Sequence, residues 1–248
     1  MAAPPCARAA FSFLTMPEPT PATPLSKLPS FNARGIAVAS VDSHLPAVAA
    51  SHLGPDALRS RFAAPPLWKP EFSAEPKYSD SAAVVASVLV PIVLRPRPTV
   101  LLTQRTGHLS THSGQIAFPG GKHDPTDVDL VATALREAHE EVGLHSRYVQ
   151  VLGSLPEYVT GSAFVITPVV ALVREGFSLA RNTNEVDDVF EVPLEFLMNP
   201  ANHRWHRFEA QGVRREWISM PFQDGDAERF IWGATAGMLR NLYRFLSA

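Results

Sequence analysis

Proline is unevenly distributed along this chain, and its distribution limits where a compact domain can form. Of the 23 prolines in 248 residues, 16 lie at or before Pro98 and 7 lie in the last 150 residues. Proline lacks an amide hydrogen and has a fixed φ, so dense proline disfavours helix interiors and central strands. From Thr99 onward proline is 7 of 150 residues, about 5%, the usual content of a globular domain. We therefore expect the ordered domain in the C-terminal two thirds.

The first 80 residues divide by composition into a leader and a linker. Residues 1–54 are rich in Pro and Ala, and up to His44 they show no sustained period of 2 or 3.6 residues, so we expect a disordered leader. It is expected to be a tail, or an overextended start with Met16 as the initiator. Residues 55–80 are expected to form a short helix from Pro55 to Phe62 and a proline-rich linker. Residues 81–248 are expected to fold as one domain.

Composition excludes several classes of protein. The lone Cys6 excludes a disulfide framework and a multi-cysteine zinc site, and it fits a reducing compartment, so we expect a cytoplasmic location. A formal net charge of -2 gives no reason to expect binding to nucleic acid or to an anionic membrane. No apolar run approaches the roughly 18 residues that span a bilayer. The oligomeric state stays open.

Strands and helices alternate irregularly through residues 81–248. The valine-rich run from Ala82 to Leu94 predicts a buried strand interrupted at Pro91, and an antiparallel neighbour is expected from Thr99 to Arg105. Because no regular βαβ repeat is present, we predict an α+β fold, a mixed sheet with helices packed on its faces. Further strands are expected at Val149 to Ser154, Phe164 to Val173 and Val186 to Val192, a short helix at Pro193 to Met198, a hairpin at His203 to Glu209 and Val213 to Met220 with its turn at Gln211-Gly212, and a last helix at about Trp232 to Leu246.

A helix rich in glutamate is expected from about Asp127 to Val142. Its apolar residues recur at i, i+3, i+4, i+7 and i+11 from Val131 onward, which gives one core-facing stripe. Asp127 is the expected N-cap, and Gly143 stands where a helix commonly ends.

Three carboxylates, Glu137, Glu140 and Glu141, share one face of this helix because they stand at i, i+3 and i+4. Like charges at this spacing destabilise a helix, whereas a bound divalent cation stabilises them, and oxygen-only ligands suit Mg²⁺ or Mn²⁺. The alternative for the spacing alone is a solvated charged face. The preceding segment FPGGK, residues 118–122, favours the metal, since its glycines admit a ligand to the backbone and its lysine can meet a phosphate.

This stretch resembles the Nudix box, Gly-x5-Glu-x7-Arg-Glu-U-x-Glu-Glu-x-Gly-U, where U is apolar. The match begins at Gly121 and ends with REAHEEVGL, residues 136–144. Asp127 replaces the first Glu of the box, and eight residues rather than seven separate it from Arg136. The resemblance implies the Nudix fold, a mixed sheet sandwiched between helices, and hydrolysis of a phosphoric anhydride. It also implies metal ligation by Glu137, Glu140 and Glu141, which Arg136 would orient.

A second match narrows the substrate. LLTQRTGHLSTHSGQIAFPGG, residues 101–121, resembles the signature LLTxR[ST]x3Rx3Gx3FPGG of the coenzyme A diphosphatase subgroup, with Ser110 in place of the second Arg. The likeness extends from about Ser81 to the C-terminus. It implies a small-molecule substrate, coenzyme A or a derivative, cleaved at its diphosphate to 3',5'-ADP and 4'-phosphopantetheine.

The remaining roles are predictions with open alternatives. In this family the general base is a glutamate of the box or a residue of a later loop, and Glu185 is the candidate in that loop. The alternative for Glu185 is a surface charge that flanks a strand. Cations are needed for the phosphates of the substrate. The candidates for binding it are Arg105 and Lys122, with Gln115 holding the chain near Gly120 and Gly121; the alternatives are a strand-end charge, a solvated lysine and a turn amide.

Two other functions stay open. The box is equally compatible with a Nudix hydrolase that acts on another nucleoside diphosphate derivative, such as ADP-ribose. A catalytically silent nucleotide-binding module is the alternative from another class, and it predicts a damaged carboxylate set or an added DNA-binding domain. Neither feature is visible in the sequence.

Overall fold

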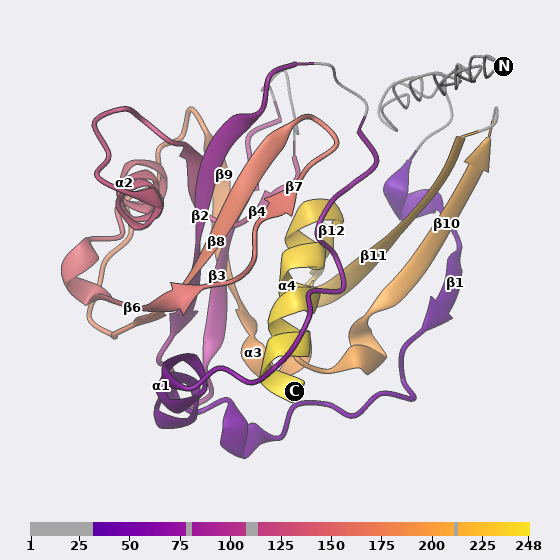
Figure 1. The fold of residues 1–248 in the computed structure, drawn as a ribbon, viewed down its shortest axis with the longest axis horizontal. Helices are drawn as coiled ribbons and strands as arrows, with labels where there is room; N and C mark the ends of the chain where they lie inside the picture. The colour runs from indigo at the N-terminus through magenta and orange to yellow at the C-terminus, as the bar shows by residue number, and fades with distance from the viewer. Residues whose placement is uncertain (1–31, 78–80, 108–113, 211–212) are drawn as a thin grey trace, which may run out of the picture.

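The fold is a larger mixed sheet between two helices, with a smaller sheet beyond one of them (Figure 1). The computed structural model describes residues 32–77, 81–107, 114–210 and 213–248. The expected turn at Gln211-Gly212 and the departure at Ser110 lie outside these ranges. Helices α2 (Leu130–Val142) and α4 (Gly233–Ser247) lie on opposite sides of the larger sheet, which confirms the predicted α+β class and the sandwich of a sheet between helices.

The larger sheet has the order β4-β3-β2-β8-β6, with β5 beside β2, β7 beside β8 and β9 beside β3. Its centre is a parallel pair, β2 with β8, flanked by antiparallel neighbours. The antiparallel pairing of β2 with β3 confirms the predicted return of the chain. The strands are β2 (Val84–Val93), β3 (Thr99–Arg105), β4 (Ile116–Ala117), β5 (Gly120–Lys122), β6 (Val149–Ser154), β7 (Tyr158–Val159), β8 (Phe164–Val173) and β9 (Val186–Pro193).

The predicted interruption at Pro91 is wrong, because Pro91 lies within β2 and opposite Ala171 of β8. The amide of Leu89 donates to the carbonyl of Pro119, on the side away from β8. Alternate residues of a strand direct their amides to the same side, so the Pro91 nitrogen also faces away from β8. On that side the pairing with β5 ends at Val88 and the pairing with β3 begins at Ile92. Proline therefore occupies a position with no ladder partner.

Helix α2 begins three residues later than expected, and its N-cap is Asp129 rather than Asp127. The Asp129 carboxylate accepts a hydrogen bond from the Ala132 amide at 2.7 Å. The predicted end at Gly143 is confirmed, and this glycine has a left-handed φ of 71°. The other helices are α1 (Pro55–Ala63), with Pro55 in its first turn as predicted, and α3 (Leu194–Leu197), with short 3-10 turns at Ala33–Gly35, Ala50–His52, Ser146–Tyr148 and Pro200–Asn202.

The smaller sheet has the order β1-β10-β11-β12 and contains a strand from the expected leader. Strand β1 (Val38–Val41) pairs with β10 (Arg204–Ala210), which pairs in turn with β11 (Val213–Asp224) and β12 (Ala227–Trp232). Val48 and Leu53 are buried in the main core. The expected disorder up to residue 54 is thus wrong from Asn32 onward. This strand could not be predicted from the sequence, because all four residues of β1 are exposed and the segment has no alternation of buried and exposed positions.

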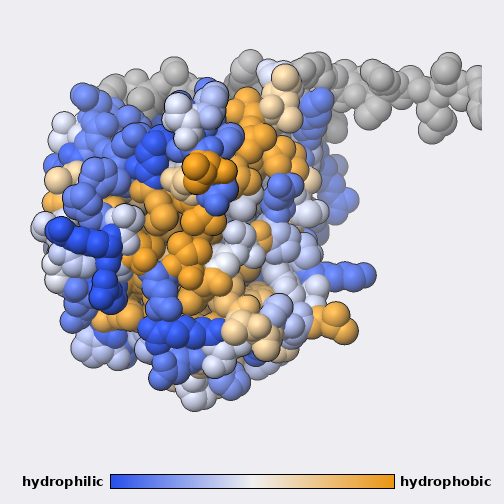
Figure 2. Space-filling model, turned by 60° about the vertical axis from the view of Figure 1, so that its left-hand side comes forward, coloured by the Kyte–Doolittle hydropathy of each residue, from blue (hydrophilic) through white to orange (hydrophobic). Residues whose placement is uncertain are grey.

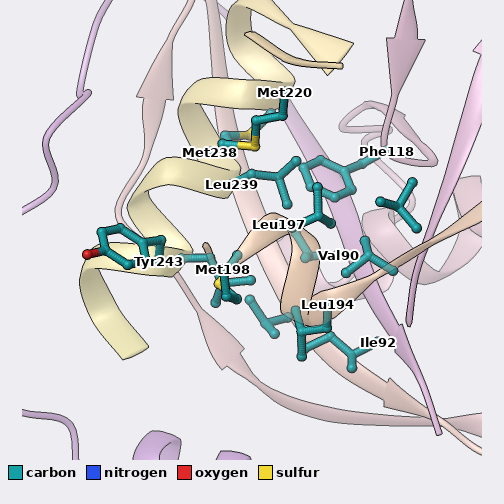
Figure 3. Close-up of a cluster of buried hydrophobic side chains, with 14 of the residues drawn as sticks. Val90, Ile92, Phe118, Leu194, Leu197, Met198, Met220, Met238, Leu239 and Tyr243 are labelled. Atoms are coloured by element: carbon teal, nitrogen blue, oxygen red, sulfur yellow. The ribbon is translucent and has the colours of Figure 1, made fainter. Parts of the chain in front are cut away.

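The main core lies between the larger sheet and α4 (Figure 3). Leu239 of α4 points toward Phe118 in the loop before β5, and Met238 lies beside Met220 of the smaller sheet. A second core cluster packs α2 onto the opposite face of the sheet through Ala134, Ala138 and Val142. Among the described residues, no helix is long and apolar enough to cross a membrane.

Candidate active site

Gly121 and Glu137 make the closest approach between β5 and α2. A Cβ atom placed on Gly121 would lie 2.5 Å from the carboxyl carbon of Glu137, a distance that no real side chain tolerates. The carboxylate of Glu137 thus rests on the bare backbone of the second glycine of FPGG. Burial is the main factor that raises the pKa of Glu137, and the charges of Glu140 and Glu185 raise it further, against the lowering effect of Arg136.

Glu141 lies one helical turn further along and is the most deeply buried of the three box glutamates. Its side chain is 4% exposed, accepts a hydrogen bond from the Gly120 amide at 3.1 Å, and forms an ion pair with Arg105 at 3.7 Å. Burial raises the pKa of Glu141 to about 7, although Gly120 and Arg105 oppose the shift. The positive charge near Glu141 is therefore too small to offset the cost of burying its carboxylate.

Arg136 orients the carboxylates from the same helix. Its Nη1 donates to Glu137 at 3.0 Å and to Glu140 at 2.9 Å. Its Nε and Nη2 donate to the two carboxylate oxygens of Asp127, and Nη2 also donates to the Lys122 carbonyl. The predicted orienting role of Arg136 matches this geometry, and Asp127 is its anchor rather than the helix cap.

Glu185 comes from the loop before β9 and reaches the same site. Its charge contributes to the raised pKa of both Glu137 and Glu141, so it lies within electrostatic range of both. The side-chain amide of Asn182 donates to Glu185 at 3.2 Å, and the backbone amide of Asn182 donates to the Glu141 carbonyl at 2.8 Å. Asn182 therefore ties this loop to the end of α2. Sequence reasoning missed it, because an asparagine before a strand also fits an ordinary turn.

Two of the predicted binding residues contribute backbone groups here. The carbonyl of Gln115 accepts a hydrogen bond from the Arg105 amide at 2.9 Å, which fixes the loop return beside β3. Lys122 offers its carbonyl to Arg136, and its side chain is exposed. Since Gly121 faces Glu137 and neighbouring residues of a strand face opposite ways, the Lys122 side chain is directed away from the glutamates. The structure thus brings Arg105, but not the Lys122 ammonium, to the carboxylates.

The chemistry of the site fits a divalent cation. It gathers carboxylate oxygens from α2 and the loop before β9, and it holds buried carboxylates whose pKa values are raised by burial and mutual repulsion. Among the described residues, however, no three acidic, histidine or cysteine side chains are arranged to hold a metal ion as they stand. Glu137 and Glu140 instead share Arg136, and Glu141 is engaged by Gly120. Metal binding would require these carboxylates to exchange partners.

The fold and the site together define a hydrolase of phosphoric anhydrides. The sequence model of the NUDIX domain family matches residues 84–219, more than half of the chain, and the chain belongs to this family. Nudix hydrolases act on nucleoside diphosphate derivatives and generally use divalent metal ions.

Relatives were found among both sequences and solved structures. The chain is 43% identical over 157 residues to the uncharacterized Nudix hydrolase NudL of Yersinia enterocolitica, covering 63% of this chain and 78% of the relative. NudL of Yersinia pestis is 42% identical over 163 residues, covering 65% and 79%. The Ap4A hydrolase complex of C. elegans has a TM-score of 0.40 at 21% identity, covering 48% and 86% of the two chains. A MutT/nudix family protein of Enterococcus faecalis has a TM-score of 0.41 at 16% identity, covering 68% and 64%.

Proposed function

We propose that this Nudix hydrolase cleaves the diphosphate bond of coenzyme A or its derivatives to 3',5'-ADP and 4'-phosphopantetheine. The observation that carries the proposal is the contact between Arg105 and Glu141. Arg105 belongs to the segment that resembles the coenzyme A diphosphatase signature, and Glu141 belongs to the Nudix box. The segment that would select the substrate thus lies against the helix that would cleave it.

Arg105 and the two glycines are proposed to bind the phosphates of the substrate. Arg105 is 28% exposed, and its charge is only partly used by Glu141 at 3.7 Å. A guanidinium forms paired hydrogen bonds with phosphate oxygens, so it can hold one phosphate beside the carboxylates. The bare backbone of Gly120 and Gly121 permits a diphosphate to approach closely.

Glu137, Glu140 and Glu141 would hold Mg²⁺ or Mn²⁺, with Arg136 as the positioning residue of Glu137 and Glu140. When bound, such a cation polarises phosphoryl oxygens and lowers the pKa of bound water. The box glutamates supply the negative charge that retains it, and Arg136 keeps Glu137 and Glu140 on one side of the helix. Asp127 fixes Arg136 in turn.

Glu185 is proposed as the general base that accepts a proton from the attacking water. It lies within electrostatic range of Glu137 and Glu141 and is oriented by Asn182. A base on a loop outside the helix can reach the water while the box glutamates stay with the cation. In the variant Glu185→Gln we expect kcat to fall roughly a hundredfold. Glu209→Gln, at an exposed position on β10, is the control.

The decisive experiment is a substrate panel with product identification. Purified protein with excess Mg²⁺ or Mn²⁺ is given coenzyme A, an acyl-coenzyme A, dephospho-coenzyme A and ADP-ribose. We expect coenzyme A or its thioester to be cleaved with the highest kcat/KM, and 3',5'-ADP to appear. Faster cleavage of ADP-ribose would reject the substrate, and ligand binding without metal-dependent turnover would reject the activity. Glu137→Gln with Glu141→Gln is the inactive control, and it should keep the fold.

A further inference from the structure

Three valines form an exposed row across the larger sheet, close to the box glutamates. Val85 of β2 is the strand partner of Val165 of β8, and Val165 is in turn the partner of Val159 of β7. Val85 is 46% exposed and Val159 is 37% exposed, while Val165 is half-buried. We call Val85, Val165 and Val159 the valine row. The side of the molecule on which α2 and β6 come forward carries a continuous hydrophobic area bordered by hydrophilic residues (Figure 2).

The valine row lies on the same face of the sheet as the carboxylate of Glu137. A Cβ on Gly121 would point at that carboxylate, and Gly121 is the strand partner of Ser87. Strand partners direct their side chains to one face, and so do residues two apart on a strand. Val85 is two residues from Ser87, so its side chain lies on the face of the sheet where Glu137 lies. The row is separated from Gly121 by about 7 Å along the strand.

Two exposed valines joined by a half-buried one in a single row differ from valines scattered over a surface. Single exposed apolar residues are ordinary, whereas contiguous ones next to a polar site mark a binding surface. Arg105 lies at the Glu141 end of the site, whereas Gly121 and the neighbouring row lie at the Glu137 end. A substrate with its diphosphate at the glutamates would therefore reach Arg105 with one half and the valine row with the other half.

We propose that the valine row binds the pantetheine arm of the substrate. This inference rests on the proposed function and adds to it the place where the second half of coenzyme A lies. In that arm a single methylene separates the phosphate ester oxygen from a carbon with two methyl groups, so an apolar group follows the diphosphate within a few ångströms. Val85, the member of the row nearest to Gly121, is about 7 Å away along the strand and would contact this apolar group first. A ribose, as in ADP-ribose, would place hydroxyl groups on the same valines.

The test replaces methyl groups by hydroxyls without changing side-chain shape. In the double variant Val85→Thr with Val159→Thr we expect KM for coenzyme A to rise roughly tenfold, since each lost apolar contact is equivalent to about one buried methylene. The inhibition constant of 4'-phosphopantetheine should rise by a similar factor, and that of 3',5'-ADP should not change. The matched control is Val38→Thr with Val41→Thr, which alters two equally exposed valines on β1 of the other sheet.

The outcomes separate this inference from the proposed function. If the wild-type protein cleaves coenzyme A and the double variant binds 4'-phosphopantetheine as tightly, the valine row is not the binding surface. Equal weakening of both product inhibitors would indicate a general disturbance of the site and would also overturn the assignment. If the wild-type protein does not cleave coenzyme A, the proposed function fails, and the inference fails with it. Thermal unfolding of each variant checks that the fold is kept.

Discussion

The guanidinium of Arg136 is bound on one side by Asp127 and on the other by Glu137. Its Nε lies 2.9 Å from Asp127 Oδ1, and its Nη1 lies 3.0 Å from Glu137 Oε1. Thr133 also donates to Asp127 at 2.9 Å. The arginine holds the pKa of the Asp127 carboxyl well below its usual range, so this anchor stays ionised across the physiological range. The aspartate that departs from the Nudix box therefore fixes the residue that orients the glutamates.

Removing this anchor should affect catalysis. In Asp127→Ala we expect kcat to fall roughly tenfold to a hundredfold, as for other residues that orient metal ligands, because Arg136 loses its fixed position. KM for Mg²⁺ should rise in parallel. Steady-state kinetics over a magnesium titration measures both, and Asp226→Ala, at an exposed turn, is the control. Unchanged magnesium dependence would show that Arg136 is held well enough without Asp127.

A side chain at Gly121 should displace Glu137. The added methyl of Gly121→Ala would lie 2.5 Å from the glutamate carboxyl carbon, so Glu137 must leave its position. We expect a loss of kcat/KM of roughly a hundredfold, comparable to that of an essential positioning contact, while the fold persists. Gly54→Ala is the matched control, since nothing lies within 4 Å of its Cβ position. Near wild-type activity in Gly121→Ala would contradict the geometry of the site.

Much of the catalytic half could be predicted from the sequence because its signals are local. The bounds of β6 and β8 follow from valine-rich runs, and the end of α2 follows from Gly143. The box glutamates share a helix face by spacing alone. Their unequal environments could not be predicted: Glu141 is buried, whereas Glu140 is exposed. This difference arises because β5 packs against one side of the helix, and the sequence spacing does not show such a tertiary contact.

The residues before α1 show the opposite case. The sequence predicts a disordered leader over residues 1–54, yet residues 32–54 contribute β1 and two side chains of the main core, Val48 and Leu53. Their attachment depends on partners more than 150 residues away, such as the contact of Asp42 with Arg240 at 2.9 Å. No local pattern encodes such a partner, so composition alone indicated disorder.

Loss of Asp42 should therefore destabilise the protein. Arg240 is buried, and it is shared between Asp42, Glu71 and His203. In Asp42→Ala the free energy of unfolding should fall by about 2 to 4 kcal/mol, because a buried charge loses one partner. Asp56→Ala removes an exposed ion pair with Arg59 and should cost less than about 0.5 kcal/mol. Urea denaturation measures the free energy of unfolding of both variants. Equal losses in the two variants would show that Asp42 does not stabilise the fold more than an exposed ion pair does.

The stability of the protein should decrease in mild acid because of His203. Its ring is buried, with Nε2 at 2.8 Å from the Leu197 carbonyl, which can only accept, and Nδ1 at 2.9 Å from Arg240, which can only donate. The neutral ring with its proton on Nε2 satisfies both partners. Burial, with a smaller effect of Arg240, lowers the pKa of His203 to about 4 from its usual value of 6.5.

The sign of the pH effect follows from proton binding. Between pH 6.5 and pH 4 the unfolded chain binds a proton at His203 that the folded protein does not bind, so stability falls as the pH is lowered through this window. The shift corresponds to about 3 kcal/mol between pH 7 and pH 4. In His203→Gln this part of the pH dependence should vanish, whereas His44→Gln, at an exposed position, should keep it. Urea denaturation at pH 7, 6, 5 and 4 measures the effect, and an equally steep decrease in His203→Gln would assign it to other groups.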